Sequence, residues 1–139
     1  MYCVNHLLLP LMQTWLRRST THLSSSAWDF TASFKQYTGL TSDLVVEYVT
    51  RLADKGALEK DCDAALLMFQ QCLLVLVECV AHPSEATSRL GCACLRHVIT
   101  SCGECLPQRF WDVVVCALHR ASQGGPCVLC GVVFLVLFC

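Results

Sequence analysis

Apolar positions along the chain recur every three to four residues in six stretches, which is the period of amphipathic α-helices. No long stretch alternates apolar and polar residues between hairpin turns, as β-strands would. The pattern therefore predicts an all-α protein whose antiparallel neighbours are joined by short loops. The predicted helices span about residues 4–18, 28–37, 43–55, 59–81, 84–101 and 107–121.

Residues that start, stop or bend helices set these bounds. Pro10 predicts a kink or a helix start within the first stretch. Gly39 is expected to end the second helix, and Thr41–Asp43 to supply the N-cap and acidic first turn of the third. Lys55 and Gly56 then form a C-terminal signal for that third helix.

The apolar stripes predict which residues form the core. The fourth helix is the longest, and its stripe is so broad that it is expected to be buried on more than one side. Leu95 and Trp111 are predicted core residues that join the last two helices across the Gly103 turn. The fourth helix has Leu66, Phe69, Leu73, Leu76 and Val80, widened by Leu67, Leu74 and Val75; the first has Leu7, Leu8, Leu11, Met12 and Trp15; the third has Leu44, Val45, Tyr48, Val49 and Leu52; the last has Phe110, Trp111, Val114, Val115 and Leu118.

Six helices with broad apolar faces and few charges do not fit a bundle with one central core. Helix pairs stacked in a row, each covering its neighbour, fit better. The predicted architecture is a HEAT/armadillo-like α-solenoid fragment of about six helices, although no repeat of fixed period is visible.

Composition narrows the class of protein further. Hydrophobic residues make up 55% of the chain and charged residues 15%, which excludes a solvated disordered chain. A formal net charge of −1 leaves no excess of basic residues of the kind that binds nucleic acid.

The apolar runs at 64–77 and 127–139 are shorter than the ~20 residues that span a bilayer. Arg17 and Arg18 follow the first apolar stretch, whereas a secretory signal carries its positive charge before it.

The chain contains 12 cysteines, and without secretion they are expected to be reduced thiols that pack as small apolar side chains. Five of them fall inside helical apolar patterns, which predicts that they are buried. These five are Cys62, Cys72, Cys79, Cys94 and Cys116.

Two C-x-x-C pairs raise the alternative of a small cytosolic zinc-binding protein. Cys102 and Cys105 form one pair, Cys127 and Cys130 the other, and four thiolates could bind zinc tetrahedrally. The 21 intervening residues exceed the common zinc-ribbon spacing and contain a helix pattern, and the second pair lies in an apolar run. The preferred interpretation is therefore that the chain holds no metal.

Other candidate chemistry is sparse. Cys94 and His97 share a helix face, but a thiol beside a surface histidine is a commoner arrangement than a nucleophilic pair. No dinucleotide, phosphate-loop, nucleophile-elbow or zinc-protease motif occurs in the sequence. We therefore predict no catalytic residue and no cofactor.

Two segments carry a family resemblance. Residues 88–99, Ser-Arg-Leu-Gly-Cys-Ala-Cys-Leu-Arg-His-Val-Ile, precede Gly103 and then Phe110-Trp111-Asp112. This helix, glycine turn and tryptophan-bearing helix resemble repeats downstream of the catalytic domain in large Arf guanine-nucleotide exchange factors of the brefeldin A-inhibited type. Residues 34–46, Phe-Lys-Gln-Tyr-Thr-Gly-Leu-Thr-Ser-Asp-Leu-Val-Val, look like the same C-terminal region. The likeness is greatest to the divergent third vertebrate member and covers about residues 4–121.

The resemblance implies a non-catalytic scaffold segment that makes protein–protein contacts in Arf signalling and in vesicle and Golgi trafficking. The exchange domain with its catalytic glutamate is expected to be absent, so no catalytic residue carries over. Expected partners are the remaining repeats of the same family and trafficking factors, with peripheral membrane association through the full-length protein. The expected location is the cytoplasm, including the surface of Golgi or secretory-vesicle membranes.

From Ser122 onward the sequence no longer looks like this family. We expect a helical-repeat region at 1–121 and an apolar tail at 122–139 that the fold does not need. A bare apolar tail of this kind promotes aggregation unless something covers it.

Overall fold

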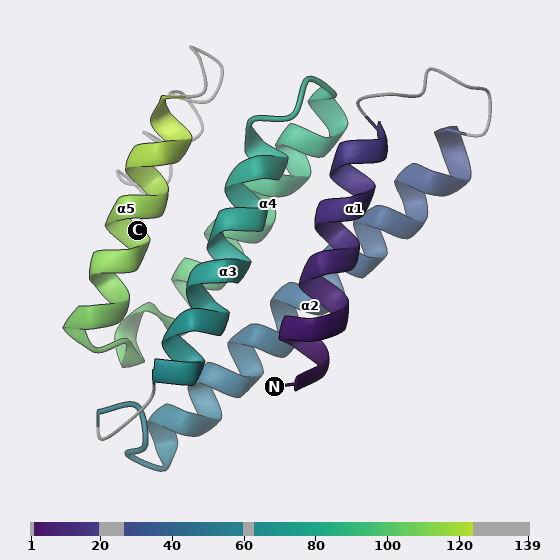
Figure 1. Cartoon of the computed structure of the whole chain (residues 1–139). Helices are drawn as coiled ribbons and strands as arrows, with labels where there is room; N and C mark the ends of the chain where they lie inside the picture. Colours follow the sequence, from purple (N-terminus) through teal and green to yellow (C-terminus); the bar gives the residue numbers. More distant parts are fainter. Residues whose placement is uncertain (1, 20–26, 60–62, 124–139) are drawn as a thin grey trace.

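The computed structural model describes residues 2–19, 27–59 and 63–123, and every regular element in these ranges is helical. The prediction of an all-α fold is thus confirmed (Figure 1). The elements are the π-helical turn η1 (Val4–Leu8), α1 (Leu9–Ser19), α2 (Ala27–Asp54), α3 (Asp63–Val80), α4 (Glu85–Cys102), the 3-10 turn η2 (Gly103–Cys105) and α5 (Gln108–Ser122).

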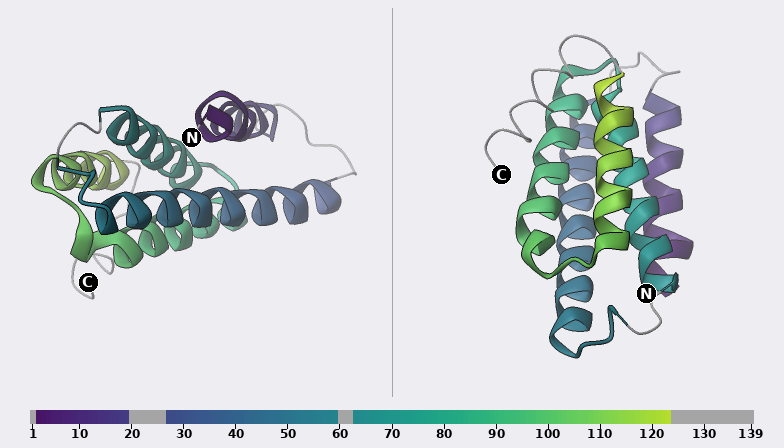
Figure 2. Two further views of the ribbon diagram at one scale, coloured as in Figure 1. Left: turned by 90° about the horizontal axis from the view of Figure 1, so that it is seen from below. Right: turned by 90° about the vertical axis from the view of Figure 1, so that its left-hand side faces the viewer.

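The helices form two layers. Helices α1, α3 and α5 lie in one layer, and α2 and α4 lie in the other (Figure 2). Within the layers α3 packs against both α1 and α5, and α2 packs against α4. Helix α3 contacts all four other α-helices and is therefore the centre of the fold.

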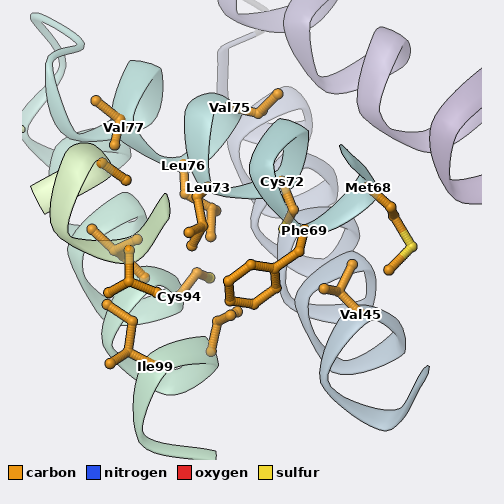
Figure 3. Packing of buried hydrophobic residues seen from close by; sticks show 14 of the residues in the cluster. Val45, Met68, Phe69, Cys72, Leu73, Val75, Leu76, Val77, Cys94 and Ile99 are labelled. Carbon is orange, nitrogen blue, oxygen red and sulfur yellow. The ribbon is translucent and has the colours of Figure 1, made fainter. Parts of the chain in front are cut away.

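The central position of α3 accounts for its apolar composition. Its predicted stripe is largely confirmed, because Phe69, Leu73, Leu76 and Val80 are all buried, and Leu66 is half-buried. Figure 3 shows Phe69, Leu73 and Leu76 within the apolar cluster. The rings of Phe69 and Phe110 lie 5.4 Å apart and join α3 to α5. Of the three residues predicted to widen this apolar stripe, Val75 is buried, as predicted, and Leu74 is half-buried. Leu67 is 55% exposed, so its predicted burial is wrong.

One long helix replaces two predicted ones, so the described residues contain five α-helices and not about six. Gly39 does not end a helix, and Thr41–Asp43 does not cap one, because α2 runs through both positions. The Thr41 hydroxyl donates to the Tyr37 carbonyl oxygen at 2.8 Å, and the Ser42 hydroxyl donates to that of Thr38 at 2.9 Å. Both hydroxyls are buried and satisfied by the preceding turn, so they have no need to cap a new helix.

Two predicted helix boundaries are confirmed. Helix α1 begins at Leu9 directly after a π-helical turn, next to the predicted break at Pro10. Helix α2 ends before Gly56, which adopts a positive φ of 60°. The Gly56 N–H donates to the Ala53 carbonyl and the Ala57 N–H to that of Leu52, the hydrogen bonds of a Schellman C-cap.

Whether the other predicted core residues are buried depends on where they lie around their helix. Leu95 is fully buried as predicted, whereas Trp111 is half-buried and lies over Gly103. Four predicted stripe residues are exposed, so their predicted burial is wrong: Leu7 (60%), Leu11 (36%), Leu44 (51%) and Val115 (62%). Leu44 and Val115 sit at the border of an apolar stripe, where a neighbouring helix decides exposure.

The predicted burial of the cysteines is confirmed for Cys72, Cys79 and Cys94. It is wrong for Cys116, which is exposed on α5. Cys62 lies outside the described residues.

Candidate functional site

The first candidate zinc pair lies where α4 passes into η2. The Cys102 thiol is buried and donates to the Val98 carbonyl oxygen at 2.8 Å. The Cys105 thiol is half-buried and donates to the Cys102 carbonyl oxygen at 3.0 Å. The other two candidate ligands, Cys127 and Cys130, lie outside the described residues.

Protonation of these thiols matters because zinc binds thiolates. Burial, with a smaller contribution from Cys105, raises the pKa of the Cys102 thiol to about 12. Burial also raises the pKa of Cys105. In residues 2–19, 27–59 and 63–123, no three His, Cys, Asp or Glu side chains are arranged to hold a metal ion. The described half of the candidate site is therefore a pair of hydrogen-bonded, protonated thiols.

The two residues of the candidate nucleophilic pair on α4, Cys94 and His97, differ in their burial. Cys94 points into the core, and burial raises the pKa of its thiol, partly offset by a hydrogen bond with Ser42. His97 lies on the surface, where its ring contacts two other residues. The buried thiol and the surface imidazole therefore do not form a nucleophile and its base.

The partners of His97 form a constellation that the sequence pattern did not predict. Nε2 of His97 lies 2.8 Å from Oδ1 of Asp43 on α2, and Nδ1 lies 3.3 Å from the hydroxyl of Ser101. These are the residue types of an acid–base–nucleophile triad. The side chains of His97 and Asp43 are 46% and 65% exposed, however, whereas such triads work in a site that excludes water. The arrangement is best described as a surface link between α2 and α4.

Exposed apolar side chains gather where α1 meets α2. The ring of Trp15 lies 5.7 Å from that of Phe34 and 5.1 Å from that of Tyr37, while Val4 lines a shallow groove with Leu44. The two helices are therefore antiparallel neighbours. Four leucines lie exposed along this stretch, two in η1 and α1 and two in α2, with the members of each pair one turn apart. We call them the N-terminal edge: Leu7, Leu11, Leu40 and Leu44.

Helix α3 is, among the described residues, the one helix long and apolar enough to cross a membrane by length and composition alone. Core helices of soluble proteins pass the same test. Because α3 is packed against four other helices, its place in the core is sufficient to explain its composition.

The fold and its surface define an all-α, two-layer helical fragment with an exposed apolar edge. Over 124 residues, 88% of its length, the chain is 38% identical to brefeldin A-inhibited guanine nucleotide-exchange protein 3 of Homo sapiens. It is also 38% identical over the same length to the protein of that name from Mus musculus. The resemblance expected from residues 34–46 and 88–112 is therefore confirmed, and the chain is related to the brefeldin A-inhibited exchange proteins.

The chain spans only 6% of the length of these curated relatives. No protein-family model matches the chain. No solved structure matches it either.

Proposed function

We propose that the chain is a non-catalytic, HEAT/armadillo-like scaffold segment that makes protein–protein contacts in Arf signalling and vesicle trafficking. Its relatives are named as guanine nucleotide-exchange proteins, and it corresponds to a small part of them. Its partners are then other helical repeats of that family and trafficking factors. Its location is the cytoplasm, including the surface of Golgi and secretory-vesicle membranes.

The observation that carries this proposal is the N-terminal edge. Exposed leucines on two adjacent helices form an apolar surface of the kind that a further helix pair covers in a stacked array. The groove beside it is lined by the buried side chains of Val4 and Met68 and also by Glu47 and Arg51. Those two side chains are paired to each other at 2.6 Å, so the surface offers apolar contact bordered by a neutral ion pair.

Calorimetry tests the proposal directly. The purified chain is titrated with the segment of the human relative that immediately precedes the matched region. The proposal predicts saturable binding with a negative heat-capacity change, since apolar surface is buried. It also predicts that the chain alone leaves the rate of nucleotide release from Arf unchanged. Absence of binding, or acceleration of nucleotide release, contradicts it.

A further inference from the structure

The first C-x-x-C pair, Cys102 and Cys105, lies at the turn that joins α4 to α5 and has no part in the proposed function. Cys102 is the last residue of α4, and Cys105 is the last residue of η2. The second pair belongs to the apolar tail predicted at 122–139, of which the structure describes only Ser122 and Gln123. The surroundings of the first pair are described, and the chemistry of its two thiols follows from them.

The backbone between the two cysteines holds them at a distance that a disulfide can bridge. Residues three apart in an α-helical or 3-10 turn have Cα atoms roughly 5–6 Å apart, from the rise and radius of these helices. Disulfides join Cα atoms that are about 4.4–6.8 Å apart. Gly103 has φ −52° and ψ −44°, so it continues the helical turn between the two cysteines. A disulfide therefore needs no rearrangement of the backbone path.

The side chains of the pair lie close to each other. The Cys105 thiol donates to the carbonyl oxygen of Cys102 at 3.0 Å, so its sulfur lies beside the backbone of its partner. The Cys102 thiol donates to the Val98 carbonyl oxygen at 2.8 Å. Because thiols are weak donors, a rotation about χ1 of Cys102 exchanges a weak hydrogen bond for contact with the Cys105 sulfur.

The two thiols differ in access to solvent, and this difference sets the order of their reactions. Cys105 is half-buried and follows the exposed residue Glu104, so a small disulfide in solution can reach its sulfur. Cys102 is only 1% exposed, so a sulfur atom within its own turn reaches it more easily than one from solution.

We infer that Cys102 and Cys105 form a reversible disulfide, with oxidised glutathione or a similar small disulfide as the oxidant. The Cys105 thiol loses its proton, and the thiolate attacks one sulfur of oxidised glutathione, breaks that S–S bond and releases one glutathione thiolate. The Cys102 thiolate then attacks Sγ of Cys105, forms the protein disulfide and releases the second glutathione thiolate. The pair gives up two electrons, and the two released thiolates take up the two protons.

The surroundings favour a disulfide that forms slowly and persists, in contrast to a rapid catalyst of disulfide exchange. The attacking species is a thiolate, whereas burial raises the pKa of both thiols. Asp54 and Glu104 raise the pKa of Cys105 further, where a reactive cysteine would have basic neighbours. A reduced pair whose thiolates are not stabilised also makes its disulfide hard to reduce.

The disulfide would close a short loop around Gly103, next to the Trp111 ring. A side-chain carbon at Gly103 would lie 3.4 Å from that ring, so this loop is part of the contact between the turn and α5. A disulfide that the folded chain favours must stabilise the fold by the same factor, because the two equilibria are linked. Oxidation should therefore raise the unfolding temperature.

Tryptic mapping tests the proposal within one peptide. Cleavage after Arg96 and Arg109 gives peptide 97–109, whose only cysteines are Cys102 and Cys105. The folded chain is incubated in a buffer of oxidised and reduced glutathione, and free thiols are then blocked with iodoacetamide in denaturant. Mass spectrometry should show this peptide two hydrogens lighter and unblocked. A peptide with both thiols blocked, or either cysteine linked to a third one, overturns the proposal.

Peptide 90–96 is the control within the same digest. It contains Cys92 and Cys94, which are two apart on α4 and so point to different sides of the helix. This peptide should keep both thiols in the buffer that oxidises peptide 97–109. An internal disulfide formed equally in both peptides would show that oxidation does not depend on the turn, and the proposal would be wrong.

Two single substitutions test the order of the reactions. Cys102→Ser removes the second attacking thiol, so Cys105 should accumulate as a mixed disulfide with glutathione. In Cys105→Ser the buried Cys102 should remain a free thiol. The opposite pattern, or equal glutathione adducts in the two variants, overturns the assigned order.

A synthetic peptide of residues 97–109 measures what the fold contributes, because it is too short to hold a stable helix. The equilibrium constant for oxidation by glutathione should be at least about tenfold larger in the folded chain than in this peptide. By linkage, the Tm of the oxidised chain should then exceed that of the reduced chain by at least about 3 °C. The Cys105→Ser variant, treated identically, corrects for oxidation elsewhere. Equal oxidation constants, or an equal Tm after this correction, overturns the proposal.

Discussion

Gly91 on α4 lies directly against the backbone of α3 at Cys79. A side-chain carbon at Gly91 would be 2.7 Å from Cβ of Cys79 and 2.6 Å from the backbone nitrogen of Val80. Both distances are far shorter than van der Waals contact, and backbone atoms cannot move aside as a flexible side chain can. The hydroxyl of Ser88, three residues earlier, donates to the Val80 carbonyl oxygen at 2.7 Å. The crossing of α3 and α4 is therefore set by backbone approach at Gly91.

This contact predicts that Gly91→Ala destabilises the protein. Overpacking at a close contact costs about 1–3 kcal/mol, more than the roughly 1 kcal/mol that alanine gains over glycine in a helix. Urea unfolding measures the difference. Gly39→Ala is the matched control, because Gly39 also lies within a helix, α2, and a side-chain carbon added there would have no contact within 4 Å. We expect Gly39→Ala to raise the free energy of unfolding by about 0.5–1 kcal/mol. A Gly91→Ala variant as stable as the parent would show that α3 and α4 are further apart.

Leu95 should be among the costliest positions to truncate. Its side chain is fully buried between helices, and Leu→Ala substitutions at such sites cost about 2–5 kcal/mol. Leu67→Ala removes the same atoms from an exposed position and should change the free energy of unfolding by less than about 0.5 kcal/mol. Comparable losses in the two variants, measured by chemical denaturation, would mean that the assigned faces of α3 or α4 are wrong.

The buried thiols predict a loss of stability at alkaline pH. Burial raises the pKa of the Cys72 and Cys79 thiols from 9.0 to about 12. The unfolded chain therefore releases these protons first, so the stability they contribute is present below about pH 9 and is lost as the pH rises towards 12. Replacing Cys72 with alanine should flatten this alkaline decrease, measured by denaturation at several pH values. Replacing exposed Cys116 with serine should leave it unchanged, and an equal effect of both would argue against burial as the cause.

The link between Asp43 and His97 should contribute little to stability. Both side chains are substantially exposed, and exposed pairs of this kind contribute ~0–1 kcal/mol. A double-mutant cycle with Asp43→Asn and His97→Gln isolates the interaction. A coupling energy well above 1 kcal/mol would show that this surface is more enclosed than the structure indicates.

The sequence predicted the helical class and the interior of α3 because the local apolar period determines both. The local pattern does not determine the role of the Thr41 and Ser42 hydroxyls, since a hydroxyl that can cap a new helix can equally donate to a carbonyl of the preceding turn. Both residues are buried in the folded chain, which favours the second choice. The exposure of Val115 has a related reason, because a residue at the border of an apolar stripe is buried only if a neighbouring helix covers it. The Asp43–His97 contact joins residues 54 apart in sequence, and no local spacing encodes such a pair.

A comparison of two single substitutions tests whether the N-terminal edge binds a partner. Leu44→Glu places a charge on that edge, and Leu67→Glu makes the same change at a leucine of similar exposure on α3, 51% against 55%. Each variant is titrated calorimetrically with the segment of the human relative that precedes the matched region. We expect Leu44→Glu to weaken binding at least about tenfold, equivalent to about 1.4 kcal/mol, and Leu67→Glu to leave the Kd within twofold. Equal affinity of the two variants for that segment would contradict binding through the N-terminal edge.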